Sequence, residues 1–148
     1  MAKTRVHSKG DYRQEEAIAG AAGIYPGMLL KLNASGAVVV HSTEGGRAEK
    51  AFAAEDALQG GTVSTVYTNG SVVTYILPVP GAVINALIED GQDIAIGDEL
   101  ISTGNGKLKD ATDLESGETL SEVIAIAEET CDLTVSNSSD TLSAVRIK

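Results

Sequence analysis

The sequence predicts a small, mainly β protein: one antiparallel, partly closed β-barrel with an extended N-terminal arm and at most one short helix. Hydrophobic residues make up 43% of the chain but aromatic residues only 3%, so Val, Ile, Leu and Ala have to build the core. These residues favour short strands, and sixteen glycines with frequent Ser, Thr, Asn and Asp supply the turns. A chain of 148 residues matches a single domain with a substantial core.

The first sixteen residues differ from the rest of the chain. They show neither helical nor strand periodicity and few apolar side chains, which predicts an extended arm at residues 1–16 before one β domain at residues 17–148. The arm is basic, with Lys3, Arg5, Lys9 and Arg13 against Asp11, whereas the whole chain has a net charge of −10. Fully stretched, such an arm reaches about 50–58 Å at most, enough to cross a neighbouring molecule. A frayed terminus is the alternative explanation from the residues alone.

The next segment alternates turn and strand signals. The turn sequence at 25–27 precedes an apolar run at 28–32, and Ser35-Gly36 separates that run from residues 37–40, so we expect two strands joined by a short loop. The Ala- and Glu-rich stretch 47–58 predicts a short helix between two glycine pairs.

The clearest local pattern lies at residues 62–77. Asn69-Gly70 divides two β-rich runs there, and Asn-Gly readily supplies the two positive φ angles of a type I′ turn. The pattern predicts a β-hairpin. Pro78 and Pro80 end its second strand because neither can donate a ladder hydrogen bond.

The remaining segments predict tight turns between very short strands of a small barrel. The turn signals are Asp90-Gly91, Gly97-Asp98 and the stretch 104–106. Further strand-like runs lie at 121–127, 133–135 and 142–147, the last of which alternates apolar and polar residues as a final strand should.

A glycine-rich stretch and an acidic stretch could suggest ligand-binding loops, but both are explained more simply as turns. Residues 97–107 lack the first glycine, replaced by Ile101, and the Ser or Thr after the lysine that a phosphate-binding loop needs, so they predict turns. The acidic residues of 90–99 do not follow the spacing of a calcium-binding loop. Lys107 at a tight turn also lacks the sequence context of a lipoyl or biotinyl attachment site.

Cysteine and histidine are too scarce for a metal or disulfide framework. Cys131 is the only cysteine, so no intrachain disulfide forms and a reducing compartment is expected. With only His7 and His41 it cannot complete a zinc shell. A nucleophile pair of Cys131 and His41 stays open on residue types, although a small buried core residue is the expected role of Cys131. We therefore predict no enzyme, and no catalytic, cofactor-binding or metal residue.

Charge limits the partners. A net charge of −10 argues against binding of the whole protein to nucleic acid or an anionic membrane, and four basic residues in the arm make a sparse nucleic-acid footprint. The chain shows no signal-peptide pattern and no run of eighteen uncharged apolar residues. A sugar-binding or hydrolytic β domain is disfavoured because stacking aromatics and a paired acid and nucleophile are missing. We expect neither nucleic acid nor a membrane as partner.

The central three-fifths of the chain resembles the tailed-phage capsid decoration (cement, head-stabilisation) proteins of the β-tulip kind. The resemblance is carried by IYPGMLLKL, by EKAFAAEDALQGGTVSTVYTNGSVVTYILPVPGAVINALI and above all by EDGQDIAIGDELISTGNGKLKDA. It implies a β-tulip-like barrel and homotrimers on the outer surface of the virion capsid, made in the host cytoplasm. It also implies that the arm contacts the major capsid protein and that the trimers stabilise the expanded shell by bridging neighbouring subunits.

An extended arm can bind by adding a strand to an exposed sheet edge. The residues we expect at the capsid contact are Lys3, Arg5, Val6, Tyr12 and Arg13. The alternative function is a self-assembling major virion or tail-tube subunit, which shares the β-rich composition but needs no pre-existing lattice.

Overall fold

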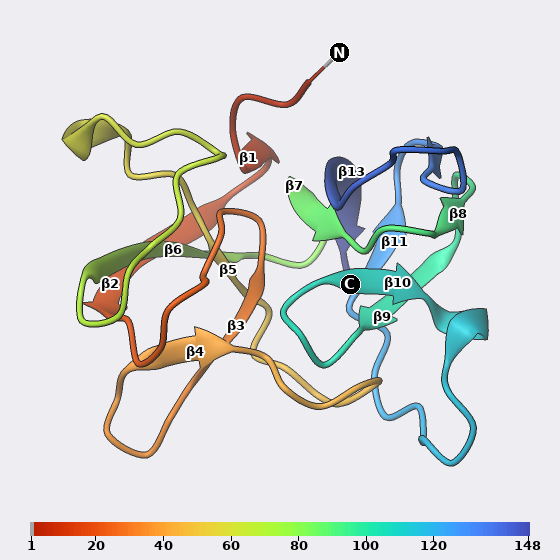
Figure 1. Ribbon diagram of the computed structural model, residues 1–148, viewed down its shortest axis with the longest axis horizontal. Coiled ribbons are helices and arrows are strands. Elements are labelled where there is room, and N and C mark those ends of the chain that lie inside the picture. Colours follow the sequence, from red (N-terminus) through yellow and green to blue (C-terminus); the bar gives the residue numbers. More distant parts are fainter. Residues whose placement is uncertain (1) are drawn as a thin grey trace.

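The protein is built from short strands and loops, as a computed structural model of the chain shows for residues 2–148 (Figure 1). The mainly β prediction is confirmed. Within these residues the only helical segments are two three-residue 3-10 turns, η1 (Ala57–Gln59) and η2 (Ala111–Asp113). The strands are β1 (His7–Lys9), β2 (Tyr12–Ile18), β3 (Leu29–Leu32), β4 (Val38–Val40), β5 (Ala51–Ala53), β6 (Val72–Pro78), β7 (Val83–Ile88), β8 (Asp93–Ile94), β9 (Glu99–Ser102), β10 (Leu108–Asp110), β11 (Ala125–Ala127), β12 (Cys131–Asp132) and β13 (Thr141–Ile147).

Five strands of the second half close into a barrel. They follow one another in the order β7, β10, β9, β11 and β13, and β13 returns to β7. The β7–β13 ladder runs from Val83 opposite Arg146 to Ile88 opposite Thr141. Only the β7–β10 contact is parallel among these pairings. The barrel, expected to be partly closed, is therefore fully closed.

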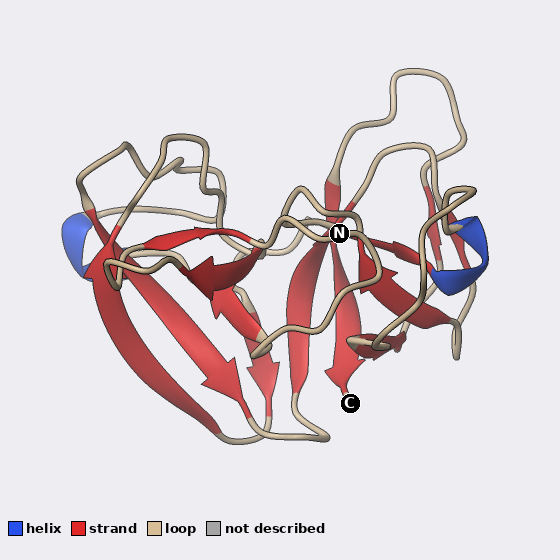
Figure 2. Ribbon diagram, turned by 90° about the horizontal axis from the view of Figure 1, so that it is seen from below, coloured by secondary structure: helices blue, strands red, loops and turns tan. Residues whose placement is uncertain are grey.

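A second sheet lies beside the barrel, as Figure 2 shows. Its order is β2-β6-β5-β3-β4. A bridge between Ala19 and Val38 brings the end of β2 back to the start of β4, so this sheet curls almost into a barrel of its own. Ile24, Leu30 and Val73 are fully buried inside it.

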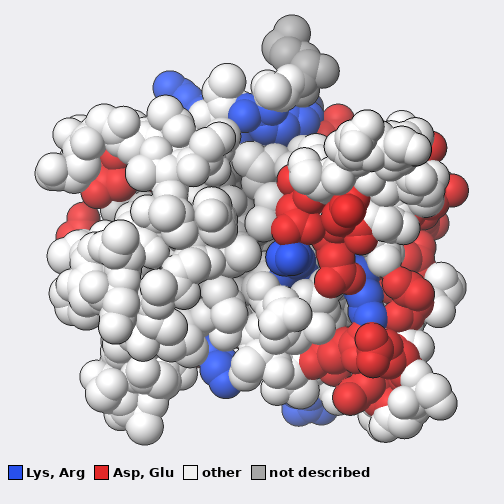
Figure 3. Space-filling view, in the orientation of Figure 1, with Lys and Arg blue, Asp and Glu red and all other residues white. Residues whose placement is uncertain are grey.

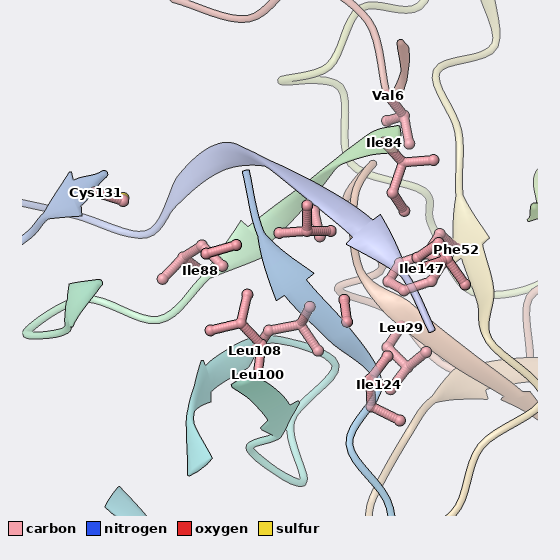
Figure 4. Packing of buried hydrophobic residues seen from close by; sticks show 14 of the residues in the cluster. Val6, Leu29, Phe52, Ile84, Ile88, Leu100, Leu108, Ile124, Cys131 and Ile147 are labelled. Atoms are coloured by element: carbon pink, nitrogen blue, oxygen red, sulfur yellow. The ribbon is translucent and has the colours of Figure 1, made fainter. Parts of the chain in front are cut away.

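The two sheets share the larger of two hydrophobic clusters. Phe52 and Leu29 of the second sheet have no exposed surface and pack with Ile124 and Ile147 of the barrel half (Figure 4). Full burial of an aliphatic or aromatic side chain of this size contributes roughly 1.5–3 kcal/mol. Because apolar residues of both sheets occupy one cluster, the halves fold as one unit.

The chain passes from one sheet to the other at two places that touch. The β1–β2 turn contains Gly10, and the β6–β7 turn leads into Ala82. Gly10 has φ +88°, and a Cβ atom on it would lie 2.9 Å from Ala82 Cα. Only glycine fits this position, because a side chain would clash with backbone and the φ angle is unfavourable for other residues.

The predicted N-terminal arm does not leave the domain. Residues 7–9 form β1, which pairs with β7, and residues 12–18 form β2, which pairs with β6 along its whole length from Tyr12↔Pro78 to Ile18↔Val72. The boundary expected after residue 16 therefore falls inside a strand. Periodicity failed here because the core-facing apolar residues are alanines, Ala17 in β2 and Ala19 just after it, and alanine gives a weak apolar signal.

Two local expectations are wrong. The hairpin at 62–77 does not form: its second run is β6, but β6 pairs with β2 and β5, and the first run is a loop with one bridge from Tyr67 to Ile24. The helix at 47–58 is replaced by strand β5 and the turn η1. Both segments lie in a sheet whose long-range pairing overrides local propensity.

The turns observed in the barrel agree better with those predicted from the sequence. The stretches 93–94, 99–102 and 108–110 are short strands joined by tight turns, and the glycine-rich segment is the β9–β10 turn closed by the Thr103 N–H bond to the Lys107 carbonyl, 3.0 Å. The last strand, β13, lies where the alternating pattern placed it. Residues 133–135 are not a strand.

Candidate functional site

The five residues predicted to contact a capsid occupy different environments. Val6 has no exposed surface, and its N–H donates to Glu55 Oε2 at 3.0 Å. Lys3 is tied by its ammonium group to Glu129, 2.8 Å. Val6 is thus a core residue and is not available for an outside partner.

Arg5, Tyr12 and Arg13 remain open to contact. Arg5 is exposed, the Arg13 side chain is 73% exposed, and Tyr12 is 42% exposed with its ring tilted against the His7 ring, 4.4 Å between centroids. These three side chains are not bonded to one another. Arg13 forms an ion pair with its neighbour Glu15 at 2.8 Å instead.

Glu129 fastens the N-terminal segment to β13. Its carboxylate accepts bonds from Lys3 Nζ, from the Ala144 N–H at 2.8 Å and from Ser143 Oγ at 3.3 Å. Burial alone would raise the pKa of Glu129, but these bonds outweigh it and hold the pKa below its ordinary value.

Acid is expected to weaken this fastening. A carboxylate whose pKa is lowered by folding stabilises the protein above its unfolded pKa, about 4.3, and loses that contribution as the pH falls through the lower folded pKa. We expect Glu129→Gln to lower the free energy of unfolding at pH 7 and to flatten its decline below about pH 5. Urea titrations between pH 7 and pH 3 measure both. Glu118→Gln, in an exposed turn, is the matched control, and an equally steep decline in Glu129→Gln would contradict the assignment.

A buried serine and histidine lie close enough to suggest nucleophilic chemistry. His41 Nδ1 and Ser102 Oγ are 2.7 Å apart, and His41 Nε2 lies 2.8 Å from the Arg47 carbonyl, to which it donates. Ser102 has no exposed surface, and its hydroxyl also accepts from the Gly104 N–H. No substrate reaches such a hydroxyl. The pair instead joins the loop after β4 to β9 of the barrel.

Cys131 is not paired with a base. Both ring nitrogens of His41 bond to Ser102 and Arg47 rather than to Cys131, so the pair left open by residue types does not form. Cys131 belongs to the large cluster and is 7% exposed; it lies at the left of Figure 4, beyond Ile88. Burial raises the pKa of its thiol, which disfavours the reactive thiolate.

Acidic turn residues serve the fold. Asp98 accepts from the Ala95 N–H at 2.8 Å and Asp90 from Ser138 Oγ at 2.6 Å. Across residues 2–148, no three His, Cys, Asp or Glu side chains are grouped so that they could hold a metal ion. No helix in that range has the length and apolar character to cross a membrane.

The surface is divided by charge. Residues 89–148 hold fourteen Asp and Glu against four Lys and Arg, which accounts for the whole net charge of −10, whereas residues 1–88 balance seven against seven. Residues 57–88 contain no charged side chain. In Figure 3 the barrel half carries dense acidic side chains, while the other half of this face is nearly uncharged.

Exposed apolar side chains gather around a groove in the charge-balanced half, residues 1–88. Leu58, Val66 and Val72 are 94%, 39% and 48% exposed and line a groove of about 550 Å³. Ile18, 49% exposed, lies opposite Val72 across the β2–β6 ladder. We call these four residues and their groove the apolar groove. Its margin includes only two acidic residues, Glu16 and Asp56.

Exposed apolar side chains gathered around a groove with few charges fit an interface with another protein better than they fit a free surface. Sequence reasoning missed this feature. The available signal was the uncharged run 57–88, whose apolar residues were assigned to hairpin strands instead of to an exposed loop.

Comparison with solved structures shows that the fold is similar to that of a phage head protein. The chain is similar to the N base of the head fiber protein gp8.5 of bacteriophage phi29, with a TM-score of 0.56 over 93% of this chain and 95% of that chain. The sequence identity is 14%, so the similarity is one of fold. No protein-family model matches the chain, and no curated protein matches it by sequence.

Proposed function

We propose that this chain is a structural protein of a tailed-phage head, which binds the outer surface of the expanded capsid as a trimer and bridges neighbouring major capsid protein subunits. The observation that carries the proposal is the fold match over nearly the whole of both chains to the base of a phage head fiber. Each bound copy adds contacts that only the expanded shell offers, so binding stabilises that shell by mass action.

The division of charge supports an orientation for the bound protein. The apolar groove can be buried without removing many charges from water, whereas covering the barrel half would desolvate many carboxylates. We therefore place the charge-balanced half, residues 1–88, against the shell and the acidic half toward solvent. Many weak contacts of this kind act together on a repeating lattice, so each one need not be tight.

Cosedimentation with expanded and unexpanded capsids tests the function. We expect saturable binding to expanded shells, and Leu58→Asp should weaken it by about tenfold or more because a charge in a desolvated contact costs over 1.4 kcal/mol. Ile96→Asp is the matched control: it places the same charge on a side chain that is 68% exposed in the acidic half. That variant should bind as the wild type does.

The alternative function gives a different result in the same assay. A self-assembling virion or tail-tube subunit would bind neither shell and would form rings or tubes as purified protein. Equal loss of binding in Leu58→Asp and Ile96→Asp would leave capsid binding in place but overturn the orientation.

A further inference from the structure

We propose that the free edge of β2 joins two copies of this chain by antiparallel β2–β2 pairing centred on Gln14. This contact goes beyond capsid binding, since it is made between copies of the protein and can be measured without capsids.

The main chain of β2 has one side in use and one side open. The Asp11 carbonyl accepts from the Val79 N–H, and the Ala19 N–H donates to the Ser71 carbonyl, so the odd-numbered residues direct their main-chain groups toward β6. The register is unbroken between them. By the two-residue alternation of a strand, the even-numbered residues direct theirs away from β6.

Three successive outward residues have no strand beside them. Within residues 2–148, β2 pairs with β6 alone, and the contact with β4 begins only at Ala19 and Gly20. The N–H and C=O groups of Tyr12, Gln14 and Glu16 thus face solvent. Such an edge is a template for an added strand, which would form up to about six main-chain hydrogen bonds with it.

The charges of β2 select a second copy of itself and fix the register. In an antiparallel pair centred on Gln14, Arg13 lies opposite Glu15 of the second copy, and the same contact occurs twice by symmetry. Centring on Arg13 places two arginines opposite each other, and centring on Glu15 places two glutamates opposite each other. Among the registers whose opposed charges both lie within β2, only the one centred on Gln14 places opposite charges face to face.

The side chains needed for this contact are accessible. Arg13 and Glu15 are 73% and 40% exposed and already attract each other within one chain at 2.8 Å. Natural sheets protect exposed edges with charged side chains or with proline. In β2, positive and negative side chains alternate along the edge. They therefore attract the β2 strand of a second copy related by a two-fold axis instead of repelling it. Such isologous pairing closes on itself and stops at two chains per edge.

A disulfide across the two-fold axis tests the pairing. Directly opposed residues in a hydrogen-bonded antiparallel pair have Cα atoms about 5.5 Å apart, within the range that a disulfide spans. We expect Gln14→Cys to form covalent dimers under mild oxidation about tenfold faster than Glu118→Cys, an exposed cysteine in a barrel-side turn. The wild type, whose single cysteine is buried, is the blank. Dimers are counted on non-reducing gels.

Charge exchange in the Gln14→Cys background tests the register. Arg13→Glu should slow dimer formation by about fivefold because it places two pairs of like charges opposite each other. Adding Glu15→Arg restores opposite charges in both pairs and should restore the rate. Gln14→Cys that reacts no faster than Glu118→Cys overturns the pairing, and a double exchange that stays slow overturns the register. Neither result bears on capsid binding, which the cosedimentation assay measures separately.

Discussion

Lys109→Met is expected to lower the free energy of unfolding by about 3–5 kcal/mol, because it leaves a buried carboxylate without its partner. Lys109 in β10 forms an ion pair with Glu44 in the loop after β4, and their side chains are only 5% and 12% exposed. Methionine fills a similar volume, so the loss reports the charge and not a cavity. Urea unfolding measures it, and the melting temperature should fall by roughly 6–20 °C.

A matched control separates the buried pair from an ordinary surface pair. Lys148 and Glu99 lie 3.6 Å apart with side chains more than half exposed, so Lys148→Met should change stability by less than about 1 kcal/mol. Replacing both buried partners, Lys109→Met with Glu44→Leu, should recover much of the loss, since apolar side chains can substitute for a buried pair. A Lys109→Met protein within 1 kcal/mol of the wild type would show that water reaches Glu44.

This ion pair also explains how the loop after β4 reaches the barrel. Glu44 bonds to Lys109, His41 to Ser102, and the Gly45 N–H to the Ser102 carbonyl at 2.9 Å. Three polar contacts therefore hold one loop of the second sheet against β9 and β10. None of them was predictable from the sequence, because the partners are separated by about sixty residues and no local pattern links them.

The features that the sequence predicted well depend on local chemistry. The turns between β8, β9 and β10 follow from glycine and aspartate positions, and β13 follows from alternation over seven residues. The β-rich composition was enough to predict the fold class. The features it missed depend on pairing partners: β6 joins β2, nearly sixty residues earlier, instead of the run beyond Asn69-Gly70.

Sequence reasoning missed the apolar groove for a related reason. A run of Val, Thr and Tyr without charges is typical of strands, and only the structure shows that residues 62–66 form a loop that exposes Val66 beside Leu58. The N-terminal residues, in contrast, were predicted as a contact surface from the basic, extended character of the segment and from the resemblance to capsid decoration proteins. The structure uses Lys3 and Val6 inside the domain and leaves Arg5 and Arg13 exposed.

Removal of residues 1–16 is expected to abolish cooperative folding. The deletion takes away β1, Val6 and most of β2, so β6 loses its β2 partner from Thr74 to Pro78 and the large cluster loses a fully buried side chain. Each lost ladder hydrogen bond costs about 0.5–1.5 kcal/mol and the loss of Val6 about 1.5–3 kcal/mol. Their sum is comparable to the whole stability of a domain, about 5–15 kcal/mol.

Amide chemical-shift dispersion and protease resistance measure this loss. Deletion of residues 1–4 is the matched control, because it removes the Lys3–Glu129 bond but keeps β1, β2 and Val6, and it should retain a cooperative transition. A 1–16 deletion that melts within a few degrees of the wild type would show that these strands are peripheral after all. If instead it unfolds, its failure to bind capsids would say nothing about an arm contact. Arg5→Glu, which alters an exposed charge outside β2 and leaves the strands in place, is then the variant that tests whether the N-terminal segment touches a shell.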